Sequence, residues 1–176
     1  MLFEPLEIEG VLKIGIEPRV DDRGFFARTF CRDEFQSNGI IFEVLQESIS
    51  FNRHKGTVRG MHFQRTPQEE TKIVRCTKGK IFDVVVDLRP RSKSFKVWLG
   101  VELSEENRRA LYIPKGIAHG FQTLCDDAEV FYSIDTPHNP GLSSGVRWND
   151  PSIDIRWPLP VSKISPRDLD FPDMET

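Results

Sequence analysis

Short runs in which apolar and polar residues alternate dominate the middle of the chain. Residues 81–88, with the sequence IFDVVVDL, predict a β-strand with one fully apolar face. The other face mixes apolar residues with two aspartates, Asp83 and Asp87. A strand with such a mixed second face is expected to line a polar cavity.

Further strands are predicted on both sides of this segment. Turn formers separate them, and they cover residues 72–77, 95–103, 111–114, 120–124 and 129–134. Long helical periodicity is absent, and a short helix over residues 32–36 ends before Asn38 and Gly39, a stop signal. Short strands at this spacing predict a mainly β protein with a few short helices, built as a sandwich, a barrel or a jelly roll.

The length of 176 residues predicts a single domain over residues 1–176 that buries its core without disulfides. We expect the core over about residues 10–150. Residues 151–176 carry five prolines and are expected to form a tail that wraps the outside of the domain or closes a cavity.

Charge and composition exclude several classes of function. The chain has 24 basic and 27 acidic residues, a formal charge of −3, which removes the electrostatic argument for binding nucleic acid or an anionic membrane. No apolar run approaches the roughly 18–20 residues of a membrane helix, and the start (MLFEP) predicts no signal peptide. Three widely spaced cysteines fit reduced thiols, so we expect a cytoplasmic protein.

His62 lies in a strand-like stretch close to Arg59 and Gly60. On strict alternation the Arg59 and His62 side chains point to opposite faces, but a bulge at Gly60 brings them together. His62 is then either a site residue or a buried histidine satisfied by the backbone.

His119 ends the sequence Pro-Lys-Gly-Ile-Ala-His, which is similar to the second motif of cupins, small jelly-roll barrels. Metal-binding cupins supply two histidines and a glutamate from a first motif, and this chain offers only His62 there. Four good ligands cannot be assembled, so we expect no metal. His119 either binds an anion or a substrate, or is a structural histidine.

Lys72 and Tyr132 are placed among apolar neighbours on two predicted strands. Lys72 either extends to solvent or holds an anion inside the barrel. The Tyr132 phenol is expected to point inward, as a reacting group or as a core aromatic whose hydroxyl bonds the backbone.

Asp168 ends the sequence Ser165-Pro166-Arg167-Asp168. A serine cap, a proline at the first helical position and an aspartate at the third form a capping arrangement, which the residues alone favour. The other interpretation is a carboxylate delivered to a histidine by the returning tail.

Taken together, these motifs resemble the dTDP-4-dehydrorhamnose 3,5-epimerases, the sugar-nucleotide epimerases of rhamnose biosynthesis. The matching segments follow the family order over nearly the whole chain: residues 22–26 (DRGFF), 58–64 (VRGMHFQ), 72–75 (KIVR), 82–89 (FDVVVDLR), 113–121 (IPKGIAHGF), 148–151 (WNDP) and 165–168 (SPRD). The resemblance implies a cupin-like double-stranded β-helix, or jelly roll, that forms a homodimer and uses neither a metal nor a redox cofactor.

The resemblance also implies roles for individual residues. His62 would be the general base, paired with Asp168, and Tyr132 the general acid. The other implied positions bind the nucleotide sugar: Arg23, Phe25, Gln46, Arg59, Lys72, His119, His138 and Arg167. Arg23 would reach the nucleotide from the partner subunit.

These residue types suit the chemistry of a 4-keto sugar. The keto group acidifies the protons at C3 and C5, and removal of one by a base spreads charge onto the carbonyl oxygen as an enolate. A cation near that oxygen stabilises the developing charge, and an acid on the opposite face inverts the carbon.

Four positions depart from the family pattern on the nucleotide side. Arg28 stands where the family has an acid, Ser48 replaces an asparagine, and His138 replaces a tyrosine that stacks on thymine. An acidic position near Ser143 is also lost. A dTDP sugar is the leading substrate, but another base, or inversion of only C3 or only C5, also fits.

Three other functions stay open on the sequence. A related sugar 3,4-ketoisomerase also works through an enolate, although Tyr132 and the Arg59–His62 spacing favour an epimerase. A non-catalytic sugar-nucleotide binding module would be expected to lose His62 or Tyr132. A metal-dependent cupin oxygenase is disfavoured by the ligand count.

Overall fold

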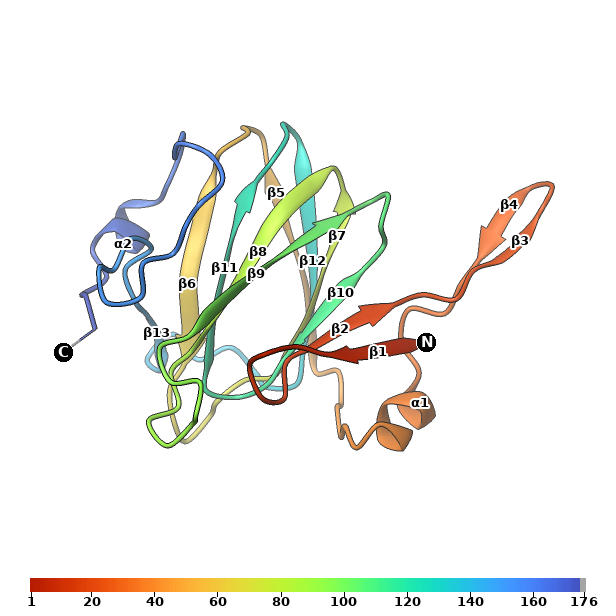
Figure 1. The fold of residues 1–176 in the computed structure, drawn as a ribbon, viewed down its shortest axis with the longest axis horizontal. Helices are drawn as coiled ribbons and strands as arrows, with labels where there is room; N and C mark the ends of the chain where they lie inside the picture. Colours follow the sequence, from red (N-terminus) through yellow and green to blue (C-terminus); the bar gives the residue numbers. More distant parts are fainter. Residues whose placement is uncertain (175–176) are drawn as a thin grey trace.

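Two antiparallel sheets face each other in the computed structural model, which describes residues 1–174 (Figure 1). The first sheet has the strand order β1 (Leu2–Pro5), β2 (Leu12–Gly15), β10 (Ala110–Ile113), β7 (Lys72–Lys78), β12 (Ala128–Ile134) and β5 (Gln46–Asn52). The second has the order β13 (Ser143–Gly145), β6 (Val58–Gln64), β11 (Ile117–Thr123), β8 (Lys80–Asp87) and β9 (Trp98–Ser104). This mainly β architecture confirms the predicted jelly-roll class.

The strand predicted over residues 81–88 is β8, and the five further predicted strands correspond to β7, β9, β10, β11 and β12. Strand β9 begins at Trp98, after its predicted start at residue 95, because Ser92 and Ser94 are held in a turn by hydrogen bonds to Asp87. Strand β11 begins at Ile117, before its predicted start at residue 120. The helix expected over residues 32–36 is α1 (Arg32–Ser37), and the only other described helix is α2 (Pro166–Leu169).

The two faces of β8 are buried in different apolar clusters. Ile81 and Val85 enter the core between the sheets, together with Phe121. Val84 and Val86 face outward into a second apolar cluster, which residues of the C-terminal tail cover. Asp83 is therefore on the inner face, and it is fully buried.

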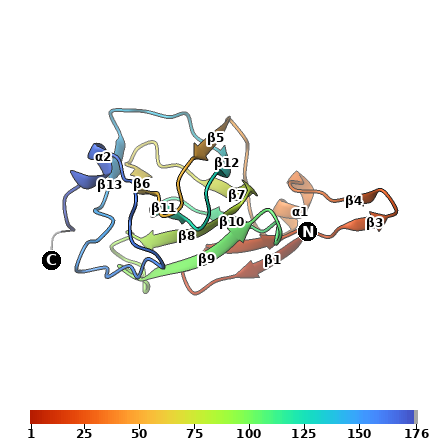
Figure 2. The same cartoon turned by 90° about the horizontal axis from the view of Figure 1, so that it is seen from above.

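The C-terminal tail packs against the outer face of the five-stranded sheet. Ile153 and Ile155 are buried in the outer cluster, and the tail then runs past β6 to α2 (Figures 1 and 2). The division into a core and a tail stays a prediction, and residues 175–176 of that tail lie outside the described residues.

A two-stranded arm extends away from both sheets (Figures 1 and 2). It consists of β3 (Arg19–Asp21) and β4 (Gly24–Phe26). Val20 and Phe26 on this arm are 75% and 74% exposed. None of the described helices is long and apolar enough to cross a membrane.

Candidate active site

A cavity of about 300 Å³ opens between the two sheets. It is lined by side chains from both sheets and from the C-terminal tail: Ser48, Ser50, Arg59, His62, Phe63, Gln64, Glu70, Lys72, His119, Phe121, Tyr132, Ile134, His138, Ser143 and Arg167. Most of the polar residues that the sequence singled out therefore lie around one space.

A bulge in β6 brings Arg59 and His62 to this cavity, as predicted. His62 pairs with His119 of β11 and Arg59 with Phe121, so β6 has one residue more than β11 over the same stretch. Gly60 lies within the bulge at a φ of 136°, and a Cβ there would lie 2.5 Å from the Cα of Gly120. Only glycine permits this close approach of the two strands.

His62 and Asp168 form a hydrogen-bonded pair at one wall of the cavity. His62 Nε2 lies 2.8 Å from Asp168 Oδ1, and the backbone N–H of Gly60 donates to Asp168 Oδ2 over 3.2 Å. Burial alone would raise the pKa of Asp168, but the hydrogen bond and charge of His62 and the bond from Gly60 outweigh it and lower that pKa. Asp168 is thus ionised at neutral pH and fixes the imidazole ring.

The preference for Asp168 as a helix-capping residue was wrong for its carboxylate. Ser165 caps α2 as predicted, because its Oγ accepts the backbone N–H of Asp168 over 3.1 Å. The cap orients the helix so that the Asp168 carboxylate reaches His62. The capping motif and the histidine partner are parts of one local structure.

Tyr132 enters the cavity from β12, in the sheet opposite His62. Burial raises the pKa of its phenol far above the usual range, and the negative charge of Asp83 adds to this rise, which Arg59 opposes. The phenol is therefore protonated at neutral pH. Its ring contacts His119 edge to face, with 5.9 Å between the ring centroids.

Lys72 does not extend to solvent. Its ammonium group donates to Glu70 Oε1 over 2.6 Å, and both side chains are largely buried. Lys72 therefore brings a positive charge to the cavity that a neighbouring carboxylate compensates. A second cation that lines the cavity, Arg59, donates from Nε to Asn52 Oδ1 over 2.7 Å.

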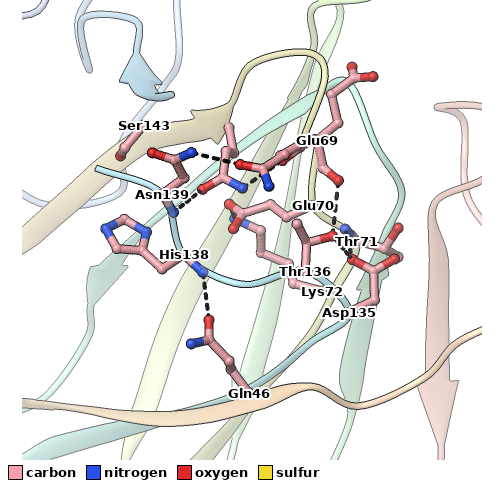
Figure 3. Close-up of polar contacts among 12 residues, drawn as sticks. Gln46, Glu69, Glu70, Thr71, Lys72, Asp135, Thr136, His138, Asn139 and Ser143 are labelled. Atoms are coloured by element: carbon pink, nitrogen blue, oxygen red, sulfur yellow. Dashed lines mark hydrogen bonds and ion pairs between the residues drawn. The ribbon is translucent and has the colours of Figure 1, made fainter. Parts of the chain in front are cut away.

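A hydrogen-bonded loop forms the rim of the cavity between β12 and β13 (Figure 3). Gln64 on β6 accepts the backbone N–H of Asn139 and donates to the Pro137 carbonyl. The backbone N–H of His138 donates to Gln46 Oε1 over 2.7 Å. These bonds fix the backbone of His138, while its side chain is exposed at the rim.

Comparison with known proteins identifies the family. A family model described as dTDP-4-dehydrorhamnose 3,5-epimerase matches residues 5–176. The chain belongs to this epimerase family. A protein of that name from Escherichia coli K12 is 46% identical over 166 residues, which cover 92% of this chain and 88% of the relative.

Solved structures of epimerases share the fold over almost the entire chain. The structure of dTDP-4-dehydrorhamnose 3,5-epimerase from Bacillus anthracis, with TDP and PPi bound, has a TM-score of 0.95 at 35% identity and covers 98% of this chain and 99% of its own. A 3′-monoepimerase from Streptomyces bikiniensis in complex with dTDP-quinovose has a TM-score of 0.90 at 32% identity, covering 97% and 86%. Enzymes that invert one centre or two thus share this architecture.

Three residues that the epimerase resemblance implied do not line the cavity of their own chain: Arg23, Phe25 and Gln46. Arg23 is on the exposed arm, where it donates to the Asp21 carboxylate. Phe25 is on the same arm, with the Arg108 guanidinium 4.7 Å from its ring centroid. Arg167, in contrast, lines the cavity and donates to Ser143 Oγ over 2.7 Å.

Residues 1–174 contain no group of three or more His, Cys, Asp or Glu side chains arranged to hold a metal ion. The two cavity histidines instead each contact a carboxylate, His62 with Asp168 and His119 with Asp83. These two pairs suit hydrogen bonding and proton transfer.

The sequence analysis gave no role to two polar residues of the site, Ser50 and Glu70; it named Ser48 only as a departure from the family pattern and Asp83 only as part of a mixed strand face. The serines lie on β5, a strand that alternation missed because most of its residues are polar and exposed. Glu70 precedes a strand and carries no periodic signal. Asp83 was placed on the cavity-lining face, but its pairing with His119 depends on the register between β8 and β11.

Proposed function

We propose that this member of the epimerase family inverts C3, C5 or both in a dTDP-linked 4-keto-6-deoxy sugar. The leading reaction converts dTDP-4-dehydro-6-deoxyglucose to dTDP-4-dehydrorhamnose. One observation carries the proposal: His62 and Tyr132 enter the same cavity from opposite sheets. Inversion of a carbon needs a base on one side of the sugar ring and an acid on the other.

His62 is the base in this mechanism. A carboxylate accepts hydrogen bonds only, so His62 Nε2 carries the proton shared with Asp168 and Nδ1 keeps a lone pair. Nδ1 removes the proton at C3 or C5, and the ionised Asp168 stabilises the imidazolium ion that results. The Gly60 backbone bond to Asp168 holds the carboxylate still during this step.

Tyr132 is the acid. Its phenol is protonated at neutral pH and stands on the wall opposite His62. The phenol gives its proton to the enolate carbon on the face that the base did not attack, which inverts the centre. The 4-keto group alone makes the sugar proton acidic, so the mechanism uses neither a metal nor a redox cofactor.

Lys72 stabilises the enolate, because its ammonium group places a hydrogen-bond donor in the cavity, and His119 contacts the sugar from the other sheet. The Glu70 carboxylate beside Lys72 holds the ammonium group in place. Arg59 and Arg167 are the cations available to the pyrophosphate, which arginines bind through paired hydrogen bonds.

The nucleotide is held partly by a second copy of the chain in this proposal. The arm exposes Val20 and Phe26, and a groove of about 460 Å³ beneath it is lined by Phe25, Phe30 and Phe131. Burial of these apolar surfaces in a homodimer would bring Arg23 to the cavity of the partner subunit. The three free cysteines fit a reducing compartment, so we place the protein in the cytoplasm.

An exchange experiment tests the reaction. The chain is incubated in heavy water with the 4-keto sugar nucleotide, and mass spectrometry and NMR report which carbons gain deuterium. We expect uptake at C3, at C5 or at both, with inverted product. No uptake with any 4-keto sugar nucleotide contradicts the proposal, and a 3-keto product assigns the chain to the ketoisomerases.

Tyr132→Phe separates the acid from the base, because it deletes only the hydroxyl. We expect deuterium to enter with retained configuration more readily than inverted product forms. Equal loss of exchange and inversion would instead give Tyr132 a binding role.

Mixed dimers test the arm. Arg23→Ala and His62→Asn subunits are each expected to be poorly active alone. Mixing them creates one site with an intact His62 and an intact arm from the partner, so activity returns. A mixture that stays inactive, or a monomer in analytical ultracentrifugation, rules the shared site out.

A further inference from the structure

Asp83 is a fully buried acid that the reaction described above does not use. It lies on the inner face of β8, opposite Phe121 of β11 and Val101 of β9, and its side chain has no exposed surface. One oxygen, Oδ1, lies 2.7 Å from His119 Nε2. The other, Oδ2, is the one buried side-chain polar atom among residues 1–174 that has no hydrogen-bond partner.

Such an arrangement is a poor way to stabilise a fold. A buried charge loses the hydration it had in the unfolded chain, and a buried ion pair seldom recovers that loss. An oxygen without a donor adds to the cost. The interior position of Asp83 therefore points to a role beyond packing.

The contact with His119 defines that role. A carboxylate accepts only, so Nε2 carries the hydrogen and Nδ1 is the ring nitrogen available to a ligand. His119 lines the cavity and is paired directly across the strands with His62. The orientation of the His119 ring thus decides which of its two nitrogens faces a ligand beside His62.

The same ring also contacts the acid. His119 and Tyr132 meet edge to face at 5.9 Å, with an interplanar angle of 76°. A rotation of the His119 ring would move its edge against the Tyr132 ring. A residue that fixes His119 therefore also helps to fix the phenol.

We propose that Asp83 is a positioning residue: it accepts the Nε2 proton of His119 and thereby presents Nδ1 to the bound sugar nucleotide. This inference rests on the proposed function, because it takes the cavity as the substrate site. Asp83 acts only through His119 and contacts no reacting atom. The arrangement is similar to that of the Asp168–His62 pair, in which a carboxylate oxygen also lies beside Nε2 of a histidine.

A double-mutant cycle tests whether Asp83 acts through His119. Asp83→Asn keeps the side-chain shape and removes the charge. We expect kcat to fall about 10–100-fold with little change in KM, as for other carboxylates that orient a functional histidine. In a His119→Gln background the same substitution is expected to change kcat less than twofold.

Asp87→Asn is the matched control, because Asp87 lies on the same strand and face and is equally buried but faces a loop. It is expected to leave kcat and KM of the folded protein unchanged. Equal kcat for Asp83→Asn and wild type overturns the proposal. It is also overturned if the double variant loses kcat by the product of the two single losses.

NMR of the wild-type histidine side chains supplies a measurement that needs neither turnover nor a folded variant. The ring nitrogens of His119 are expected to show the hydrogen on Nε2, and addition of dTDP-quinovose, which a related monoepimerase binds, is expected to shift the Nδ1 resonance. A hydrogen on Nδ1 in the free protein would overturn the proposal. Absence of deuterium exchange in wild type, with the Nε2–H form intact, would instead contradict the proposed function.

Discussion

Strand β8 carries two buried aspartates with different hydrogen-bond partners. Asp87 accepts from the backbone N–H, Nε and Nη2 of Arg89 and from the hydroxyls of Ser92 and Ser94. Asp83, on the same face, has one partner and one oxygen without any. Both side chains are fully buried, so burial alone does not distinguish them.

The difference lies in how completely each carboxylate is satisfied. Asp87 organises the turn before β9, and its hydrogen bonds outweigh the burial that would raise its pKa, which is held far below its usual range. Asp83 lies behind the cavity and shares one bond with a histidine that lines it. Of these two acids, the fully bonded Asp87 stabilises a turn of the fold, whereas the incompletely bonded Asp83 contacts a residue of the site.

Among the residues of the cavity, His62 should be the one whose substitution lowers activity most. His62→Asn removes the proposed base but retains a polar side chain of similar size. We expect deuterium uptake to fall about 10²–10⁴-fold, the usual contribution of general acid–base catalysis, with little change in melting temperature. Near wild-type exchange in the folded variant would exclude His62 as the base.

Of the two aspartates of β8, Asp87 should be the one whose substitution lowers the stability of the fold. Asp87→Asn removes the charge that accepts from Arg89 and from two serines, so the free energy of unfolding should fall by about 2–3 kcal/mol. Urea unfolding monitored by circular dichroism measures this change. Turnover of the folded protein should be unaffected, and a loss of kcat at unchanged stability would show that the two aspartates do not differ as argued.

The same variant makes a prediction about pH. The folded-state pKa of Asp87 is lowered, so its stabilisation is present above the unfolded-state pKa of about 4 and is lost as pH falls towards the folded-state value. The stability difference between wild type and Asp87→Asn should be largest above about pH 5 and shrink below about pH 4. A difference that stays constant down to pH 2 would contradict this assignment.

Much of this comparison could be anticipated from the sequence. The alternation in residues 81–88 predicted both the strand and the mixed face that carries Asp83 and Asp87. Gly60 predicted the bulge that unites Arg59 with His62. These features depend on local periodicity and on the steric freedom of one glycine, which a sequence displays directly.

The partners of the polar groups could not be anticipated in the same way. Asp83 and His119 meet because β8 and β11 pair in a particular register. Strand β5 and the arm were missed because their residues are mostly exposed and their alternation is weak. Contacts between distant segments follow from the assembled sheets rather than from local pattern.

Asp168 combines the two categories, because its backbone is part of a helix cap and its carboxylate is part of the site. Asp168→Asn keeps the cap and removes the charge that stabilises protonated His62. We expect a fall in kcat of about 10–100-fold, smaller than that of His62→Asn, with an ordered tail. Lower stability with unchanged turnover would assign the carboxylate to the fold after all.

The smallest expected effect is at His138, on the rim. Its backbone N–H donates to Gln46, so the side chain is attached to a fixed part of the loop (Figure 3). Stacking of an aromatic side chain on a base contributes roughly 1–3 kcal/mol in nucleic-acid complexes, and an imidazole offers less surface than a phenol ring. His138→Tyr should therefore tighten dTDP binding several-fold, measured by calorimetry beside a uridine diphosphate control. Equal affinities of variant and wild type for both nucleotides would mean that the His138 side chain faces solvent. The hydrogen bonds of the rim would then stabilise the fold without contributing to nucleotide binding.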